Sequence, residues 1–104
     1  MFFHATKDSL KNNTMQGTVN WMAPEVVRDN NVTRFVDIWS LASTVYEMTV
    51  GAPPWFAERD VIRKLMEIEG PPDYPDYISA DLEDFFNQCF QIEPSNRANV
   101  YELL

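Results

Sequence analysis

A segment at residues 35–50, FVDIWSLASTVYEMTV, constrains the fold more than any other part of the chain. Apolar residues recur at helical spacing on more than one side of it, and only Asp37 and Glu47 are charged. A helix that is apolar on nearly every side has to be packed against several neighbours, so we predict that this helix is the centre of the fold. Thr33 is expected to cap its start, and Gly51 to end it. One of its faces is expected to carry Ile38, Leu41, Ala42, Val45 and Met48.

Further helices are predicted on both sides of this segment, so the chain should be mainly α-helical, with no sheet. A short helix is expected at residues 25–28, and a longer one at residues 58–69 that is closed by Gly70. Ser79 is expected to cap the next helix, and a last short helix should start at Asn99. The helix after Ser79 carries one unbroken apolar stripe: Leu82, Phe85, Phe86, Cys89 and Phe90.

The composition narrows the partners that this chain can have. Its 104 residues make one domain or part of one, and 45% apolar residues are too many for a disordered chain. A net charge of −8 argues against nucleic-acid binding, because few bases are present to neutralise phosphates. Nine of the 16 acidic residues lie within residues 57–84. They form either a solvated acidic face or a docking surface for basic partners.

Disulfide, metal and membrane chemistry are not predicted. Cys89 is the only cysteine and His4 the only histidine, so no metal site is expected, and Cys89 is interpreted as a small buried apolar residue. No apolar run is long enough to span a bilayer, so we expect no membrane partner and a cytoplasmic location.

The sequence contains no nucleophile–base pair, no glycine-rich phosphate loop and no metal cluster, and therefore no complete active site. It does carry a series of short motifs: GTVNWMAPE at residues 17–25, DIWSLA at 37–42, APPW at 52–55 and EPSNR at 93–97. Together and in this order, they resemble the second half of a eukaryotic Ser/Thr protein kinase domain. The residues in these motifs are most similar to those of kinases of the MAP kinase kinase kinase (STE) type.

This resemblance implies a C-lobe fragment of the protein-kinase-like fold, built from the EF, F, G, H and I helices. Residues 1–28 would be the activation segment with its P+1 loop and APE motif, and residues 33–104 the helical C-lobe. Thr18 would contact the catalytic aspartate and lysine, which favours Ser/Thr specificity. The segment expected to bind the peptide substrate comprises Gly17, Thr18, Val19, Asn20, Trp21 and Met22.

Other positions are expected to have structural roles. Glu25, which closes the APE motif, would pair with Arg97, because a carboxylate in so apolar a stretch needs a bidentate partner. The alternative is that both are ordinary surface charges. Asp37 would hold the catalytic loop, or it is simply an acid favoured by the helix dipole. Pro24 and Trp39 complete this structural set.

Two hydroxyl residues in the activation segment, Ser9 and Thr14, are candidate phosphorylation sites. Their position in the segment comes from the resemblance. A phosphate there acts as a switch only if an arginine cluster binds it. Ordinary loop hydroxyls are the alternative.

Several motifs that a complete kinase domain contains are missing from this sequence. The Gly-rich loop, the strand lysine, the catalytic loop and the magnesium-binding aspartate do not occur in it. We expect ATP and magnesium in the full-length kinase, no cofactor in these 104 residues, and no activity from this fragment alone. Its partners would be a protein substrate with Ser/Thr, the missing N-lobe and catalytic loop, and a second copy held through exposed apolar surface. The alternatives are a non-catalytic kinase-like interaction module, and an unrelated bundle in which Glu25 and Arg97 lie far apart.

Overall fold

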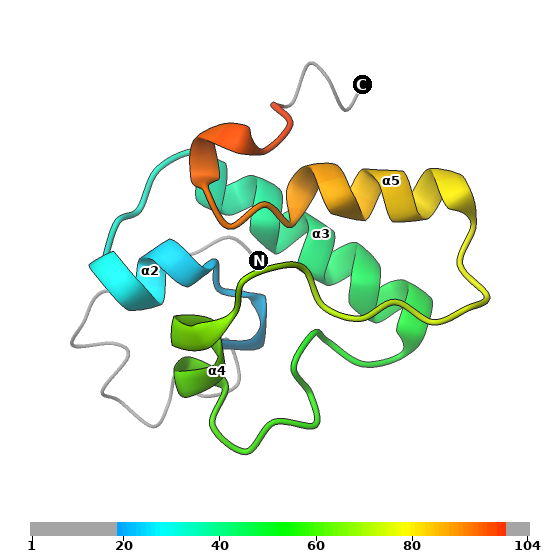
Figure 1. The fold of residues 1–104 in the computed structure, drawn as a ribbon, viewed down its shortest axis with the longest axis horizontal. Helices are drawn as coiled ribbons and strands as arrows, with labels where there is room; N and C mark the ends of the chain where they lie inside the picture. The colour runs from blue at the N-terminus through cyan, green and yellow to red at the C-terminus, as the bar shows by residue number, and fades with distance from the viewer. Residues whose placement is uncertain (1–18, 100–104) are drawn as a thin grey trace.

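The computed structural model describes residues 19–99, which form helices and connecting loops without a strand in that range (Figure 1). The α-helices are α2 (Pro24–Asp29), α3 (Phe35–Val50), α4 (Val61–Glu67) and α5 (Ala80–Cys89), and a short 3-10 helix, η2, spans Pro94–Asn96. The prediction of a mainly α-helical fold is confirmed. No helix in this part of the chain combines the length and the apolar character that crossing a bilayer requires.

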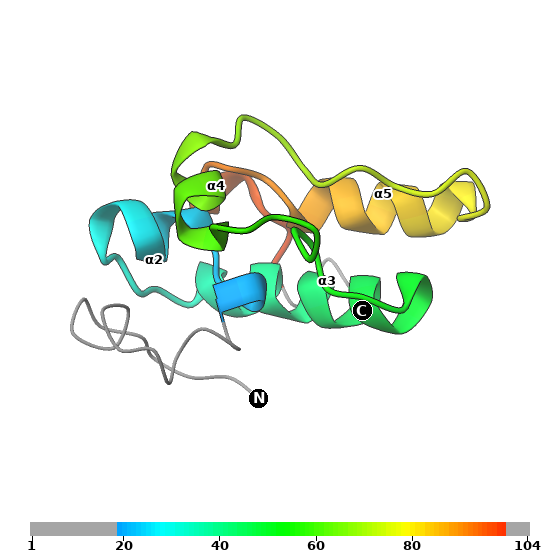
Figure 2. The same cartoon turned by 90° about the horizontal axis from the view of Figure 1, so that it is seen from below.

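Two long helices, α3 and α5, lie side by side along the molecule, and α2 and α4 pack together near one end (Figures 1 and 2). Aromatic rings fill the space between α3 and α5. Trp39 meets Phe90 edge-on at 4.9 Å between centroids, and Tyr46 meets Phe86 at 5.8 Å. These side chains are buried, so the apolar stripe predicted for α5 does face the core.

The predicted bounds of α3 are confirmed, but its start is not capped as expected. Arg34 precedes the first helical residue and makes no side-chain cap. Thr33 lies one residue earlier, and its hydroxyl accepts a hydrogen bond from the Phe35 N–H at 3.3 Å. The first turn is tight, because the Val36 N–H donates to the Thr33 carbonyl. The N-cap position of α3 is therefore occupied by Arg34 and not by Thr33.

The sides of α3 differ in burial, and the sequence pattern did not separate them. Val36, Trp39 and Tyr46 are buried under α5 and neighbouring segments, whereas Met48 is 81% exposed. Met48 belongs to the face that was predicted from spacing, so part of that face is exposed in the described structure. Of the other residues on that predicted face, Ala42 is buried, and Ile38, Leu41 and Val45 are partly buried.

The helix predicted at residues 58–69 is shorter at both ends. It begins at Val61, because the Asp60 carboxylate accepts a hydrogen bond from the Arg63 N–H at 3.1 Å and caps the first turn. It ends at Glu67, and Ile68 is already extended, so Gly70 is not its closing residue. The first short helix is one residue longer than predicted at each end, since Pro24 occupies its first position and Asp29 its last.

The cap predicted for α5 is confirmed, since the Ser79 hydroxyl accepts a hydrogen bond from the Leu82 N–H at 3.1 Å. After α5 the chain turns through η2. The helix predicted from Asn99 onward falls almost entirely outside the described residues.

Two glycines offer a matched test of backbone strain. Gly51 ends α3 with a φ of 93°, where its N–H donates to the Glu47 carbonyl, whereas Gly70 has no such positive φ. A Cβ at either position would meet no atom within 4 Å. Gly51→Ala is therefore expected to lower the free energy of unfolding by about 1 kcal/mol through strain alone. Gly70→Ala should be neutral or slightly stabilising, as urea denaturation of both variants would measure; equal effects would contradict this explanation.

Candidate functional site

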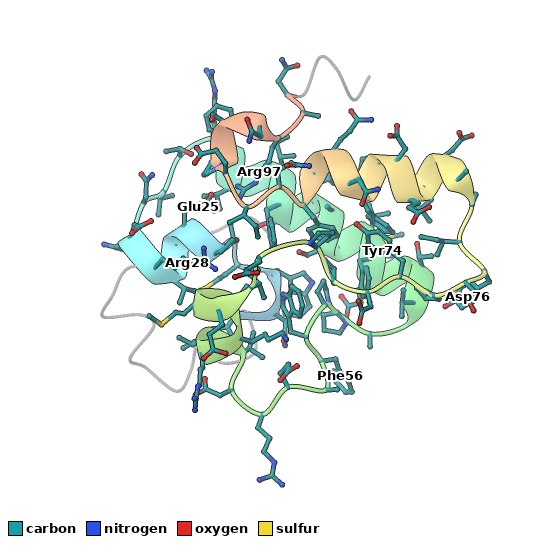
Figure 3. All side chains as sticks on the ribbon, in the orientation of Figure 1. Glu25, Arg28, Phe56, Tyr74, Asp76 and Arg97 are labelled. Carbon is teal, nitrogen blue, oxygen red and sulfur yellow. The ribbon has the colours of Figure 1, made fainter. Side chains whose placement is uncertain are left out.

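The structure brings Glu25 and Arg97 together in a buried, bidentate ion pair. One guanidinium nitrogen of Arg97 lies 2.7 Å from Oε2 of Glu25, and the other lies 2.7 Å from Oε1. The side chain of Glu25 is 5% exposed, and that of Arg97 is 0% exposed. The two residues are 72 positions apart in the sequence, so this pair fixes the first turn of α2 against the segment that follows η2 (Figure 3). Two parallel charge-assisted bonds are the arrangement that arginine favours with a carboxylate.

Arg97 makes further contacts besides the pair with Glu25. Its Nε donates to the Gln91 carbonyl at 2.9 Å, and Nη1 also donates to the Phe35 carbonyl at 2.9 Å. The guanidinium lies 5.1 Å from the ring centre of Trp39, which is fully buried. One side chain thus joins α2, the start of α3 and the turn after α5, and its charge is compensated where water is excluded.

A second arginine contributes to the site, and the sequence interpretation missed it. Arg28, in the last turn of α2, donates from Nε to the Leu65 carbonyl at 3.0 Å and from Nη2 to the Ile68 carbonyl at 2.7 Å. These carbonyls lie at the C-terminal end of α4, where unpaired backbone oxygens and the negative end of the helix dipole attract a cation. The only sequence signal was a basic residue at the end of a short helix, and nothing in it identified α4 as the neighbour.

Removing the Arg28 side chain is expected to loosen α4. Arg28→Ala eliminates two charge-assisted hydrogen bonds, so the free energy of unfolding should fall by about 1.5–3 kcal/mol. Arg28→Lys, which can keep one of the two bonds, should lose less. Hydrogen exchange of the α4 amides measures this directly, and unchanged protection in Arg28→Ala would contradict it.

The described part of the predicted substrate segment packs against α3. Val19 and Met22 are buried, and the Met22 N–H donates to the Val19 carbonyl at 3.2 Å. The Ser40 hydroxyl of α3 donates to the Trp21 carbonyl at 3.0 Å. Asn20 is half-buried, and its Oδ1 has no hydrogen-bond partner among residues 19–99. The backbone of this segment is therefore held to the central helix.

Several predicted site residues are not placed by the structure. Gly17, Thr18, Ser9 and Thr14 lie outside the described residues. Asp37 is described, and it is exposed on the first turn of α3. Its structural role stays a prediction, as do the roles assigned to the others.

The described residues offer little for metal or thiol chemistry. Within residues 19–99, no group of three or more His, Cys, Asp or Glu side chains is arranged to hold a metal ion. Cys89 is buried, as predicted, and burial raises the pKa of its thiol to about 11. This thiol is therefore protonated at neutral pH and does not act as a nucleophile there.

Comparison with known proteins decides the family. Residues 2–104 match the protein kinase domain. The chain belongs to the protein kinase family. This kinase chain is 39% identical over 94 residues to mitogen-activated protein kinase kinase kinase YODA of Arabidopsis thaliana, which covers 88% of the chain and 11% of YODA. It is 40% identical over 99 residues to serine/threonine-protein kinase STE20 of Saccharomyces cerevisiae, covering 92% of the chain and 10% of STE20.

A third kinase relative is named differently. Dual specificity protein kinase zakA of Dictyostelium discoideum is 43% identical over 88 residues, which cover 85% of the chain and 10% of zakA. The kinase chain thus spans about a tenth of the length of each of these relatives. The predicted resemblance to MAP kinase kinase kinase and STE-type kinases is confirmed, because proteins with those names match most of the chain.

Proposed function

We propose that this chain is the substrate-docking and structural part of a Ser/Thr protein kinase, which transfers the γ-phosphate of ATP to Ser/Thr hydroxyls of proteins when the whole catalytic domain is present. The observation that carries the proposal is the buried pair between Glu25 and Arg97. It lies at the positions where the APE motif and the arginine of the kinase pattern occur in this sequence. Because the pair fixes α2, it also fixes the end of the segment that would bind the substrate.

The proposed docking role rests on the way residues 19–22 are held. The Trp21 carbonyl is bound to Ser40 of α3, and Val19 and Met22 are anchored in the core. A segment with fixed backbone can present a preformed pocket to the residue after the phosphoacceptor, which avoids the entropic cost of ordering it on binding. Gly17 and Thr18 would continue this segment toward the catalytic loop.

We further propose that ATP and magnesium bind only to the complete domain, and that these 104 residues alone are inactive. Phosphoryl transfer depends on metal ligands, a lysine that binds the phosphates and a base that orients the acceptor. The sequence carries none of the corresponding motifs. The same proposal includes a cytoplasmic location and phosphorylation at Ser9 or Thr14. It also includes self-association through the open side of α3 around Met48.

A chimera tests the proposal. Residues 17–104 would replace the matching segment in the kinase domain of yeast STE20, which is 40% identical to this chain over 99 residues. With radiolabelled ATP, magnesium and a basic protein substrate, the chimera should phosphorylate serine and threonine, as phosphoamino-acid analysis would show. The 104-residue chain by itself should transfer no phosphate.

The control is the same chimera with the catalytic aspartate of STE20 replaced, which sets the background. A chimera that folds and binds ATP yet stays at that background would contradict the proposed function and favour a non-catalytic interaction module. Phosphate transfer by the purified 104-residue chain would contradict the proposed inactivity.

A further inference from the structure

A groove lies between the loop at residues 52–58, helix α4 and the segment at residues 68–73. It consists of two adjoining hollows of about 310 and 300 Å³. Both have Trp55, Lys64 and Asp73 in their walls, so they lie next to each other and are treated together as one groove. None of the contacts described above for the ion pair or for residues 19–22 uses this groove.

The apolar part of the groove is exposed aromatic surface on a stiff loop. Phe56 is 70% exposed and projects from the edge of the molecule (Figure 3). Trp55 adopts a φ of 65°, a conformation that a bulky residue rarely takes and that costs free energy. Its indole N–H is buried and has no acceptor among the described residues. A strained backbone next to an exposed aromatic side chain is typical of a binding surface rather than of packing.

The rim of the groove is acidic. Glu58 and Asp73 line one hollow, and Glu67, Glu69 and Asp73 line the other. Lys64 is the one basic residue in these walls, and it is already engaged, with Nζ 3.7 Å from Glu58 and 5.8 Å from the Trp55 ring centre. Glu67 is paired as well, with Arg63 at 3.2 Å. Among the described residues, Glu69 and Asp73 are the wall carboxylates without an ion pair. Their negative charge repels nucleic acids and anionic lipids and attracts Lys or Arg side chains.

The walls are held in place without a ligand. The Tyr46 hydroxyl of α3 donates to the Asp73 carbonyl at 2.9 Å, and Arg28 donates to the Ile68 carbonyl at 2.7 Å. These bonds fix both ends of the 68–73 segment. A rigid groove loses less conformational entropy on binding than a flexible one, so even a short ligand can bind measurably.

We infer that this groove binds a short extended segment of a partner protein, with one apolar or aromatic side chain seated against Trp55 and Phe56 and with Arg or Lys residues on either side. The aromatic contact provides most of the affinity, and the acidic rim selects for basic flanks. The inference goes beyond the proposed function, because it concerns the recruitment of a partner and not phosphoryl transfer. A binding measurement on the full chain detects it whether or not the chain is active.

The test is fluorescence polarisation of a labelled, blocked peptide with a central phenylalanine and two arginines on each side. Phe56→Ala should weaken binding by about tenfold, since it removes a central aromatic contact. Asp73→Asn should weaken it by about threefold, and this effect should shrink at high salt because charges on a rim are screened. Peptides with alanine for the phenylalanine, or glutamine for the arginines, should bind correspondingly less well.

Two variants serve as matched controls. Tyr77 is 69% exposed, close to the 70% of Phe56, but it does not line the groove. Asp76 is likewise exposed, and Figure 3 places it far from Phe56. Tyr77→Ala and Asp76→Asn should leave the affinity within about twofold of the original. Circular dichroism checks that each variant is folded.

Any of three results would overturn the inference. The peptide could fail to bind to the folded chain, it could bind equally well to Phe56→Ala, or the control variants could weaken binding as much as the groove variants. A fourth result would assign the groove to a second copy of this chain: self-association in sedimentation experiments that Phe56→Ala abolishes, without peptide binding.

Discussion

Arg97→Ala is expected to destabilise the chain by about 3–5 kcal/mol, because it leaves the carboxylate of Glu25 buried without a partner. The variant also loses the hydrogen bonds from Arg97 to the carbonyls of Gln91 and Phe35, and the contact of its guanidinium with the Trp39 ring. Urea denaturation followed by circular dichroism would measure the change. A small domain has a free energy of unfolding not much larger than this loss. If Arg97→Ala shows no cooperative unfolding transition because it is already unfolded, the prediction is met as well.

The control for this prediction is an arginine in an exposed ion pair. Arg63 lies 3.2 Å from Glu67, and the two side chains are 76% and 62% exposed. Arg63→Ala should change the stability by no more than about 0.5 kcal/mol, because water already screens such a pair. If Arg63→Ala and Arg97→Ala had similar effects, the buried pair would not be what stabilises this end of the fold.

Phe86→Ala is expected to have an effect of similar size, a loss of about 3–5 kcal/mol. Phe86 is fully buried between α3 and α5. Its ring centre lies 5.4–5.8 Å from the ring centres of four other residues. They are Tyr46, Tyr74, Phe85 and Phe90. Alanine would leave a cavity that rigid rings cannot collapse to fill, so the cost should lie in the upper part of this range.

An exposed phenylalanine provides the comparison. Phe56→Ala removes the same atoms from a side chain that is 70% exposed, so it should change the free energy of unfolding by less than about 1 kcal/mol. Thermal or urea unfolding of both variants would decide. A cost for Phe86→Ala as small as that for Phe56→Ala would mean that the aromatic cluster is not the core of this fold.

The main helices could be predicted from the sequence because their signals are local. The bounds of α3 follow from apolar spacing that ends at Gly51, and the start of α5 follows from the Ser79 cap. Caps and spacing act within a few residues, so a single sequence contains them. Which side of α3 is buried depends on where α5 and α2 lie. The exposure of Met48 therefore could not be predicted from spacing alone.

Prediction failed for α4 and its surroundings because the interactions there are long-range or compete with one another. Asp60 caps α4 and shortens it, although Glu58 and Glu69 are good helix formers. The hydrogen bonds from Arg28 to α4 join residues 37 and 40 positions apart, and no local pattern indicates them. The Trp55 backbone, with a φ of 65°, also has no sequence signal, since glycine is the residue usually found there.

The candidate site was predictable only to the extent that motifs mark it. The pair of Glu25 and Arg97 was expected from the resemblance and from the rule that a buried carboxylate needs a partner. The motif does not indicate the hydrogen bonds from Arg97 to two backbone carbonyls, or the hydrogen bond that the Ser40 hydroxyl donates to the Trp21 carbonyl. These depend on how α3 meets the loops around it.

A double-mutant cycle on Glu25 and Arg97 tests the central claim most directly. The free energies of unfolding of the original chain, Glu25→Ala, Arg97→Ala and the double variant give the coupling energy between the two side chains. A buried bidentate pair predicts a coupling of about 2 kcal/mol or more, with the double variant much more stable than the sum of the single losses implies. Additive losses, within about 0.5 kcal/mol, would mean that the two side chains do not interact in solution. That result would contradict the account.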